Sequence, residues 1–506
     1  MPLASPRRCG RIRRCGQIRR CGRTGRSRQA GRPPPGTEGP PVHVVVAGGG
    51  ITGLAAALHL AKTGVEVTVI EPSARLGGML RTSPFAGRMV DEAADAFLIR
   101  TPPALALAHR IGLGDTLVHP ARRRAFVARD GALHPLTPQV MGVPVDLDAL
   151  DRSGLLTAAG RTGLGRDLTD PATPLPAGDV AIAEAIGDRI GGEAVARLVD
   201  PLVGGINAGD SARLSLAAVV PQLDAARRDP DHASLIEACR AQVARGRAAG
   251  ADPDAPIFAA PDGGMARLPA AVAQAAVATD RVAVRLGQAV VAVDPGPVVI
   301  LSDGTTLEAD GVVVATPGPT AAGLLRPVAP DAADLLGNVP HVSVAFVRLA
   351  VSLEALGHAL DGSGMLIGRS EGRAVTACSW ASSKWAHLAP ARGDGTALLR
   401  AAVGRDGDQG ALELDDADLV ARVVDDLTPL LDLRGGPTET SVHRWERAFP
   451  QYRPGHLDRV AACEAALADV APTVALAGMH LRGVGIPACV ASGLAAADRV
   501  LAALRP

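Results

Sequence analysis

A glycine-rich turn near the start of the sequence restricts the possible folds more than any other feature. The pattern G-x-G-x-x-G at residues 48–53 follows a β-forming run, Val42–Ala47, and opens an alanine- and leucine-rich helical pattern over Thr52–Thr63. No Asp, Glu, Lys or Arg occurs between Val42 and Ala61, so this segment is also as long as a membrane span. Glycines interrupt its middle, however, and we therefore expect a strand, a tight turn and a helix.

An acidic residue after this turn makes the prediction specific. A second β-forming run, Val65–Ile70, ends in Glu71, which comes 18 residues after the last glycine of the turn. In a dinucleotide-binding domain such an acid accepts hydrogen bonds from a ribose, the glycines let the backbone approach a pyrophosphate, and the first helical amides face the phosphates. The predicted nucleotide-binding residues of the turn are Gly48, Gly49, Gly50, Ile51, Thr52 and Gly53.

A second glycine pair indicates which dinucleotide binds. Arg75, Gly77 and Gly78 follow Glu71 closely, and the segment resembles the extended fingerprint of the flavin amine oxidase and protoporphyrinogen oxidase superfamily. The resemblance implies FAD as the cofactor, with Gly77 and Gly78 close to its pyrophosphate and Arg75 against its adenosine end. It also implies the fold class, which is α/β: a Rossmann-like FAD-binding domain of the glutathione-reductase and amine-oxidase type, a mixed-sheet substrate domain and a helical subdomain.

Later segments are similar to the parts of this superfamily that return to the cofactor. Short β-forming runs between residues 281 and 315 predict strands, and the resemblance places Val290 at the adenine and Ala315 near the cofactor. Near the C-terminus, a strand, a glycine-rich loop and a helix resemble the segment along the pyrimidine edge of the flavin. A helix start there would stabilise the reduced flavin through its partial positive charge. The predicted residues are Gly478, Gly485, Ile486 and Pro487.

Segments in the middle of the chain resemble one particular family within this superfamily. The runs 200–210, 376–385 and 444–456 are similar to the oxygen-dependent protoporphyrinogen and coproporphyrinogen oxidases, and most similar to the coproporphyrinogen III branch. Several of these motifs are absent from monoamine oxidases and phytoene desaturases. The resemblance adds Asp95 and Trp445 to the expected cofactor contacts. Ala93 stands where this family has a glycine close to the flavin.

The resemblance implies a reaction as well. It is the FAD- and oxygen-dependent six-electron oxidation of coproporphyrinogen III to coproporphyrin III, with release of hydrogen peroxide, in haem synthesis. We assign no catalytic side chain, because a flavin does this chemistry, and no metal-ligand spacing occurs in the sequence. Arg100 and Lys384, at family-like positions, are candidates for binding the propionates. All tryptophans and the single tyrosine occur between Trp380 and Tyr452, which favours one shared site for a flat ligand.

Other functions stay open at this point. Protoporphyrinogen IX is an alternative substrate, and a flavin oxidase acting on amines or polyenes is an alternative enzyme. A third alternative is a nucleic-acid- or metal-binding protein with a vestigial flavin fold, and it depends on residues 1–41. These residues carry eleven arginines, one acid and three Arg-Arg-Cys-Gly repeats. We interpret them as a disordered tail that a start site placed too far upstream would explain, and we expect no nucleic-acid partner.

The formal charge of zero averages two unlike parts of the chain. Residues 1–41 carry +10, so the remaining 465 residues carry −10 and must bind a substrate with several carboxylates through few, local cations. Scattered cysteines in this body favour a reduced, cytoplasmic protein. We expect no membrane-spanning segment and at most peripheral contact with the inner face of the membrane. The reactants implied are a porphyrinogen and oxygen, and a ferrochelatase is a compatible partner.

The predicted domain organisation is discontinuous along the chain. The tail comprises residues 1–41. The FAD-binding domain comprises residues 42–95, 261–325 and 455–506, the substrate domain residues 96–115, 205–260 and 326–454, and the helical subdomain residues 116–204.

Overall fold

The computed structural model describes residues 41–170, 178–252, 255–390 and 394–505. The chain divides into two units, Met1–Pro41 and Val42–Pro506. The expectations for residues 1–40 lie outside the described residues, and the fold is that of the second unit.

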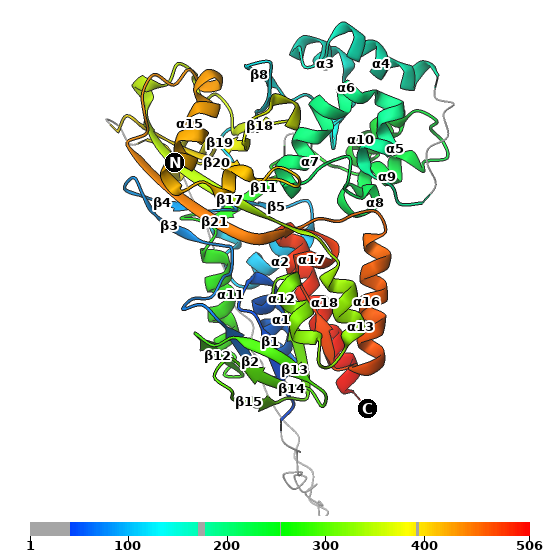
Figure 1. The fold of residues 1–506 in the computed structure, drawn as a ribbon, viewed down its shortest axis with the longest axis vertical. Helices are drawn as coiled ribbons and strands as arrows, with labels where there is room; N and C mark the ends of the chain where they lie inside the picture. The colour runs from blue at the N-terminus through cyan, green and yellow to red at the C-terminus, as the bar shows by residue number, and fades with distance from the viewer. Residues whose placement is uncertain (1–40, 171–177, 253–254, 391–393, 506) are drawn as a thin grey trace, which may run out of the picture. The chain divides into compact units, whose positions relative to one another are not determined.

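A five-stranded parallel sheet is the centre of the predicted dinucleotide-binding domain (Figure 1). All four pairings between neighbouring strands are parallel. Its central strands are short, valine-rich and almost entirely buried, as expected for a parallel sheet covered on both faces. The strands lie in the order β12 (Val282–Leu286), β2 (Glu66–Glu71), β1 (His43–Ala47), β16 (Gly311–Val314) and β22 (Val474–Leu476).

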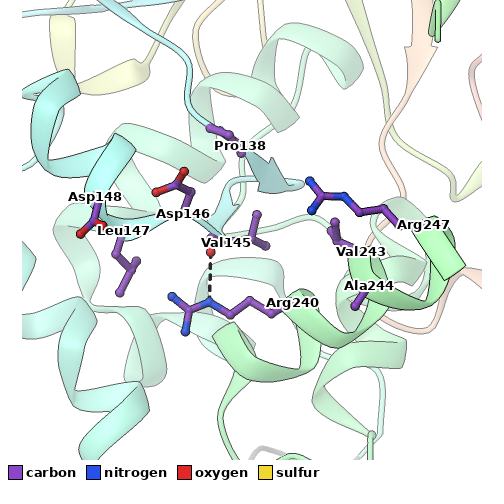
Figure 2. Close-up of a pocket in the computed structure, with 9 residues that line it drawn as sticks. All are labelled: Pro138, Val145, Asp146, Leu147, Asp148, Arg240, Val243, Ala244 and Arg247. Atoms are coloured by element: carbon purple, nitrogen blue, oxygen red, sulfur yellow. Dashed lines mark hydrogen bonds between the residues drawn. The ribbon is translucent and has the colours of Figure 1, made fainter. Parts of the chain in front are cut away.

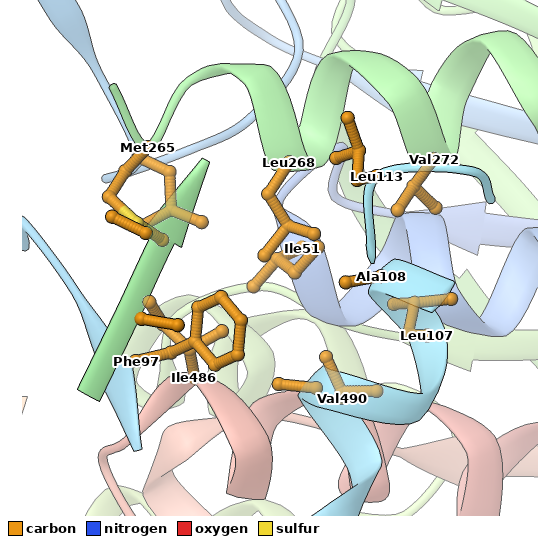
Figure 3. Packing of buried hydrophobic residues seen from close by; sticks show 14 of the residues in the cluster. Ile51, Phe97, Leu107, Ala108, Leu113, Met265, Leu268, Val272, Ile486 and Val490 are labelled. Carbon is orange, nitrogen blue, oxygen red and sulfur yellow. The ribbon is translucent and has the colours of Figure 1, made fainter. Parts of the chain in front are cut away.

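Two long helices from opposite ends of the chain pack on each other beside this sheet. They are α1 (Ile51–Lys62) and α18 (Ile486–Leu504). The helices approach so closely that a Cβ atom added at Gly493 of α18 would lie 2.2 Å from the carbonyl oxygen of Thr52 in α1. Figure 3 shows the apolar cluster around the start of both helices, which also takes side chains from α2 (Pro102–Arg110) and α11 (Arg267–Val277).

The helix α18 bears on the expected absence of a membrane-spanning segment, which stays a prediction. By length and composition it could cross a membrane, and no other helix of the described part of the chain meets that criterion. Sequence reasoning expected no such segment. The contact between Gly493 and α1, and the burial of Val490, Ala496 and Val500, explain the apolar composition by packing within the dinucleotide-binding domain.

A second, mixed sheet of seven strands carries the predicted substrate domain. One pairing, β7 with β18, is parallel, and the other five are antiparallel. The helix α15 (Asp416–Leu431) packs its apolar side on this sheet. The strands lie in the order β21 (Glu439–Pro450), β17 (His341–Ser352), β20 (Thr396–Val403), β19 (Val375–Ser379), β18 (Gly364–Ile367), β7 (Ala125–Arg129) and β8 (Ala132–Pro135).

A group of helices forms a separate apolar core. This core extends from Val127 to Cys239, so it does not end at the predicted boundary of residue 204. One segment, Val195–Val199, is a π-helix. The helices are α3 (Leu147–Ser153), α4 (Ala158–Thr169), α5 (Ile182–Ile190), α6 (Gly192–Ala194), α7 (Asp200–Asn207), α8 (Leu216–Val219), α9 (Pro221–Arg227) and α10 (Leu235–Ala248).

Smaller elements complete the unit, and together they confirm the predicted α/β class with a Rossmann-type domain, a mixed sheet and a helical part. The limits of the three domains stay predictions. The remaining strands are β3 (Thr82–Phe85), β4 (Arg88–Asp91), β5 (Phe97–Leu98), β6 (Leu117–Val118), β9 (Gln139–Val140), β10 (Val143–Pro144), β11 (Phe258–Pro261), β13 (Val290–Asp294), β14 (Val298–Leu301) and β15 (Thr306–Glu308). The remaining α-helices are α12 (Gly318–Leu325), α13 (Pro330–Gly337), α14 (Ala381–Lys384), α16 (His456–Val470) and α17 (Met479–Arg482).

Candidate functional site

The carboxyl edge of the parallel sheet brings the predicted nucleotide-binding residues together. Because β1, β2, β16 and β22 run parallel, their carboxyl ends lie along one edge. Open α/β sheets bind ligands at this edge, where the strand order reverses, which here is between β1 and β16. The residues at or just after these strand ends are Gly48, Glu71, Ala315 and Gly478.

The three motif glycines of the first turn, Gly48, Gly50 and Gly53, have different surroundings. A Cβ at Gly48, whose φ is +109°, would lie 2.6 Å from the Ala315 carbonyl oxygen, and one at Gly53 would lie 2.0 Å from the Gly48 carbonyl oxygen. Both positions therefore need glycine for packing. A Cβ at Gly50 would meet nothing within 4 Å. The Cα of Gly50, which carries no side chain, therefore faces open space. We expect this at a position where the protein backbone approaches a ligand.

Two helices begin at this edge, and apolar side chains anchor their first turns. Ile51 of α1 and Ile486 of α18, both predicted cofactor residues, point into the same apolar cluster (Figure 3). They can offer a ligand only their backbones. Gly485 is the N-cap of α18 and Pro487 lies in its first turn, where a missing N–H costs no hydrogen bond. The first turns of the two helices contain no acidic residue. The positive end of each helix dipole is therefore not neutralised by a side chain of its own helix.

Glu71 connects the first turn to the end of β2. The Gly49 N–H donates a hydrogen bond of 2.8 Å to Glu71 Oε2, and the Ser73 N–H and hydroxyl donate bonds of 3.0 and 2.7 Å to Oε1. An ionised carboxylate oxygen accepts about two hydrogen bonds. Oε2 therefore has room for one more donor, and a ribose hydroxyl at this position stays our prediction.

The second glycine turn lies directly against the first. The Gly77 N–H donates to the Gly49 carbonyl oxygen at 2.8 Å, and a Cβ at Gly78 would lie 3.3 Å from the Gly50 Cα. Arg75 donates from Nη2 to the Gly78 carbonyl oxygen at 2.6 Å. Burial lowers the pKa of Arg75. In this structure Arg75 thus holds the second turn, and its predicted contact with adenosine is not tested.

Two further observations support a dinucleotide at this edge. Val290 is buried at the start of β13, and the nearby Gln288 N–H lies 3.3 Å from the Glu71 carbonyl oxygen. Thr316, next to Ala315, has a buried hydroxyl without a hydrogen-bond partner among the described residues. The open Cα at Gly50, the spare acceptor on Glu71 and the two uncapped helix starts all fit a dinucleotide with a diphosphate.

Asp95 is the centre of a buried ionic cluster. Lys384 Nζ lies 2.9 and 3.0 Å from its two oxygens, and Arg400 Nη2 lies 3.2 Å from Oδ2. Trp385 Nε1 donates to Oδ2 at 3.3 Å and Ser379 Oγ at 3.2 Å. Burial alone would raise the pKa of Asp95, but Arg400 and Lys384 outweigh it and lower that pKa. Lys384, a predicted propionate ligand, is thus paired with a predicted cofactor residue, and sequence reasoning missed Arg400.

Asp91, four residues before Asp95 in the sequence, has a pKa that shifts in the opposite direction. Its Oδ1 accepts hydrogen bonds from the Thr82 hydroxyl at 2.5 Å and from the Met265 N–H at 2.8 Å. Burial is the largest effect and raises the pKa of Asp91 to about 6. Ala93, between the two acids, is buried and has no positive φ. The surrounding protein therefore accommodates the methyl group of Ala93.

The aromatic residues do not share one site, and that expectation was wrong. Trp380 and Trp385 are fully buried in two different apolar clusters, where they fill core volume. Trp445 lies in β21 and packs with Phe449 beside the buried Val344. The indole N–H of Trp445 is buried without a partner among the described residues. Trp445 therefore stays a candidate for a ligand contact.

Arg100 is exposed and makes no ion pair with any residue that the structure describes. Its predicted role as a propionate ligand is not tested.

Two clefts lie elsewhere in the fold. A cleft of about 620 Å³ lies between Leu147 and Arg240, where Arg240 Nε donates to the Val145 carbonyl oxygen (Figure 2). A second cleft, of about 430 Å³, is lined partly by Arg369. Neither cleft contains a predicted site residue.

Comparison with known proteins agrees with this geometry. Residues 51–501 match the family described as flavin containing amine oxidoreductase, and residues 5–96 match the pyridine nucleotide-disulphide oxidoreductase family. The chain is 34% identical to the coproporphyrinogen III oxidase of Bacillus subtilis (strain 168), with 91% of this chain and 98% of that protein covered. It is 36% identical to the protein of the same name from Mycobacterium leprae (strain TN), with 91% and 97% covered.

A solved structure shows the same relationship. It comes from Exiguobacterium sp. 255-15, and its protein is provisionally described as a protoporphyrinogen oxidase. It superposes with a TM-score of 0.79 at 28% identity and covers 91% of this chain and 98% of that one. The chain therefore belongs to the flavin-containing amine oxidoreductases, in the branch of the coproporphyrinogen III and protoporphyrinogen oxidases, and its cofactor is a flavin.

Proposed function

We propose that this protein is an FAD- and oxygen-dependent coproporphyrinogen III oxidase. The observation that carries the proposal is the match of nearly the whole chain, at 34–36% identity, to relatives that bear this name. The reaction removes six electrons and six hydrogens from the porphyrinogen, and three oxygen molecules accept them to give three molecules of hydrogen peroxide.

The chain's own residues would bind and orient the reactants. Bound FAD supplies the two-electron oxidation that is needed three times for each porphyrin. The first amides of α1 and the bare Cα of Gly50 would hold its pyrophosphate, and Glu71 Oε2 would accept a ribose hydroxyl. The start of α18 would direct a partial positive charge to the ring. No side-chain base is assigned, because tautomerism of the pyrroles can relay protons within the substrate.

The negative charge of the substrate favours cationic side chains close to its binding site. Coproporphyrinogen III carries four propionates, while residues 42–506 have a formal charge of −10. Arg100 is an exposed cation without an ion pair among the described residues, and it is our first candidate for a propionate contact. Lys384 keeps one N–H that Asp95 does not occupy, so we retain it as the second candidate.

A cytoplasmic location belongs to the same proposal. Four cysteines of the described residues, Cys239, Cys378, Cys463 and Cys489, are buried and free, which suits a reducing compartment. We also propose at most peripheral contact with the inner face of the membrane, and a ferrochelatase as the partner that takes the porphyrin. Co-purification of an added ferrochelatase would test the last point.

The decisive experiment compares two substrates. The purified protein should be yellow, and anaerobically prepared coproporphyrinogen should give porphyrin fluorescence and peroxide when enzyme and air are added. Protoporphyrinogen IX is the second candidate substrate, which the Exiguobacterium structure favours. A higher rate on protoporphyrinogen would overturn the substrate assignment. A colourless protein that added FAD cannot restore would overturn the proposal as a whole.

A further inference from the structure

The loop between β22 and α18, residues 478–485, contains the short helix α17 and is held by two side chains from another part of the chain. Tyr452 Oη donates a hydrogen bond to the Met479 carbonyl oxygen and accepts one of 2.9 Å from the Gly483 N–H. His456 Nε2 lies 2.8 Å from the Leu481 carbonyl oxygen. Because a carbonyl only accepts, Nε2 of His456 carries the ring proton. The backbone groups of Met479, Leu481 and Gly483 are thus held by two side chains, Tyr452 and His456.

The two rings also support each other. Tyr452 and His456 stack with centroids 4.1 Å apart and an interplanar angle of 18°. Both are buried, with 2% and 0% of their surface exposed. Burial raises the pKa of Tyr452 and lowers that of His456 to about 4, so both are neutral near pH 7. The pair adds hydrogen bonds to the loop without adding charge.

The backbone of this pair is fixed from the helical part of the fold. The Ser215 N–H donates to the Tyr452 carbonyl oxygen at 2.7 Å, and the Gly455 N–H donates to Asp179 Oδ2 at 2.8 Å. Asp179 also accepts the Ser215 hydroxyl at 2.7 Å. The pair is therefore a rigid support, and the loop that it holds precedes the α18 start.

The loop needs such support because of its own composition. Gly478 and Gly483 have φ values of +147° and +144°, conformations that glycine adopts at a high cost in chain entropy. The Gly478 N–H is held by the Ser492 hydroxyl at 2.9 Å, but Met479, Leu481 and Gly483 use the Tyr452–His456 pair. Without the pair, the buried Leu481 and the partly exposed Met479 and Gly483 would lose these partners, and the loop would be free to move.

We infer that Tyr452 and His456 are positioning residues that hold the 478–485 loop, and with it the positive start of α18, at the flavin ring. This inference rests on the proposed function, because it requires a flavin at the carboxyl edge. An electrostatic contribution to a bound ring depends on a fixed distance. The pair therefore sets how strongly the protein prefers reduced over oxidised flavin. This gives a role to Tyr452 and His456 within the family-like run 444–456.

The test measures the flavin midpoint potential of the holoenzyme. Tyr452→Phe keeps the stacked ring and removes only the hydroxyl. We expect the reduced flavin to lose about tenfold in relative affinity, which lowers a two-electron potential by about 30 mV, with a similar fall in kcat/KM. His456→Leu should have the same effect, and His456→Gln should restore most of the potential, because its amide N–H can reach the Leu481 carbonyl oxygen.

The control separates positioning from stability. Leu467 is buried on α16, about three turns beyond His456, and its side chain makes no hydrogen bond. Leu467→Ala should lower the midpoint of thermal unfolding and leave the potential unchanged. If Tyr452→Phe gives no folded protein, the His456 variants carry the same test.

The possible failures are distinguishable. A wild-type protein without flavin would overturn the proposed function. A yellow wild type whose Tyr452→Phe and His456→Leu variants keep the wild-type potential would overturn this inference alone. Equal potential shifts in His456→Gln and His456→Leu would also overturn it, since the hydrogen bond to the loop would then play no part.

Discussion

Adding a single methyl group at Gly50 should abolish cofactor binding and leave the apoprotein intact. A Cβ at this position meets no protein atom within 4 Å, and its φ of −71° suits alanine. Gly→Ala stabilises a chain by about 0.4–1 kcal/mol through its unfolded state. Alanine is a poorer N-cap than glycine by a similar amount. We therefore expect the unfolding free energy of Gly50→Ala apoprotein to stay within about 0.5 kcal/mol of wild type.

The cofactor-bound state should respond differently. The methyl would occupy the space of the pyrophosphate and cost one or two charge-assisted hydrogen bonds of about 1.5–3 kcal/mol each. The dissociation constant of FAD should rise about 100-fold. With FAD at 100 times its wild-type dissociation constant, ligand stabilisation of about 2.7 kcal/mol in the wild type should fall to about 0.4 kcal/mol in Gly50→Ala.

Gly362→Ala is the matched control, because Gly362 is a tightly packed glycine that lies in none of the predicted cofactor segments. Its Cβ would lie 2.5 Å from the Arg124 carbonyl oxygen, so the two backbones must move apart. We expect a loss of about 1–3 kcal/mol in the apoprotein. Denaturant titrations of apoprotein with and without FAD measure both effects. If FAD stabilises Gly50→Ala against unfolding as much as it stabilises the wild type, the assignment of this edge to the pyrophosphate is refuted.

Three further substitutions test the charges of the site. Glu71→Gln should weaken FAD binding about tenfold in a fluorescence titration, since a hydrogen bond to a charged acceptor is worth about 1.5–3 kcal/mol; unchanged affinity would contradict the ribose contact. Asp95→Asn leaves Lys384 and Arg400 buried without a carboxylate and should cost about 3–5 kcal/mol of unfolding free energy at pH 7. Because the pKa of Asp95 is lowered in the folded state, its stabilisation is present above the unfolded pKa of about 4 and is lost as the pH falls further, so the difference from wild type should shrink in acid. Asp91→Asn should do the reverse. The folded pKa of about 6 exceeds the unfolded value, so ionisation of the carboxyl destabilises the fold increasingly above about pH 4 and fully above about pH 6. The variant should therefore gain about 2–3 kcal/mol at pH 7 and nothing below pH 4. A gain that is independent of pH would contradict the raised pKa.

Local chemistry explains which parts of the fold were predictable. The strand β1 and the helix α1 each differ by about one residue at their ends from the predicted ranges, because valine runs and glycine turns act over a few neighbouring residues. The same pattern is the basis for the predicted role of Gly50. Such signals also found the loop before α18, whose glycines and Pro487 are local features.

Contacts between distant segments explain what was not predictable. Lys384 and Asp95 are 289 positions apart, and only the packing of α14 against the segment after β4 brings them together. The same holds for Tyr452 and the 478–485 loop, although the family-like segment around Tyr452 was a signal that something there mattered. Trp380 and Trp385 are close in sequence but lie in different cores. Spacing along the chain could not separate them.

The interleaved strand order has a consequence for biosynthesis. The carboxyl edge is complete only when β22 has paired with β16 and α18 has covered α1. At about 5–20 residues per second, a ribosome needs roughly 20 to 100 s to reach Val474. During that time the buried side of α1 lacks its final cover, and the glycine turn at residues 48–53 lacks its neighbouring helix start. Completion of the flavin site is therefore a late event, because the helix that finishes it is also the last helix to be synthesised.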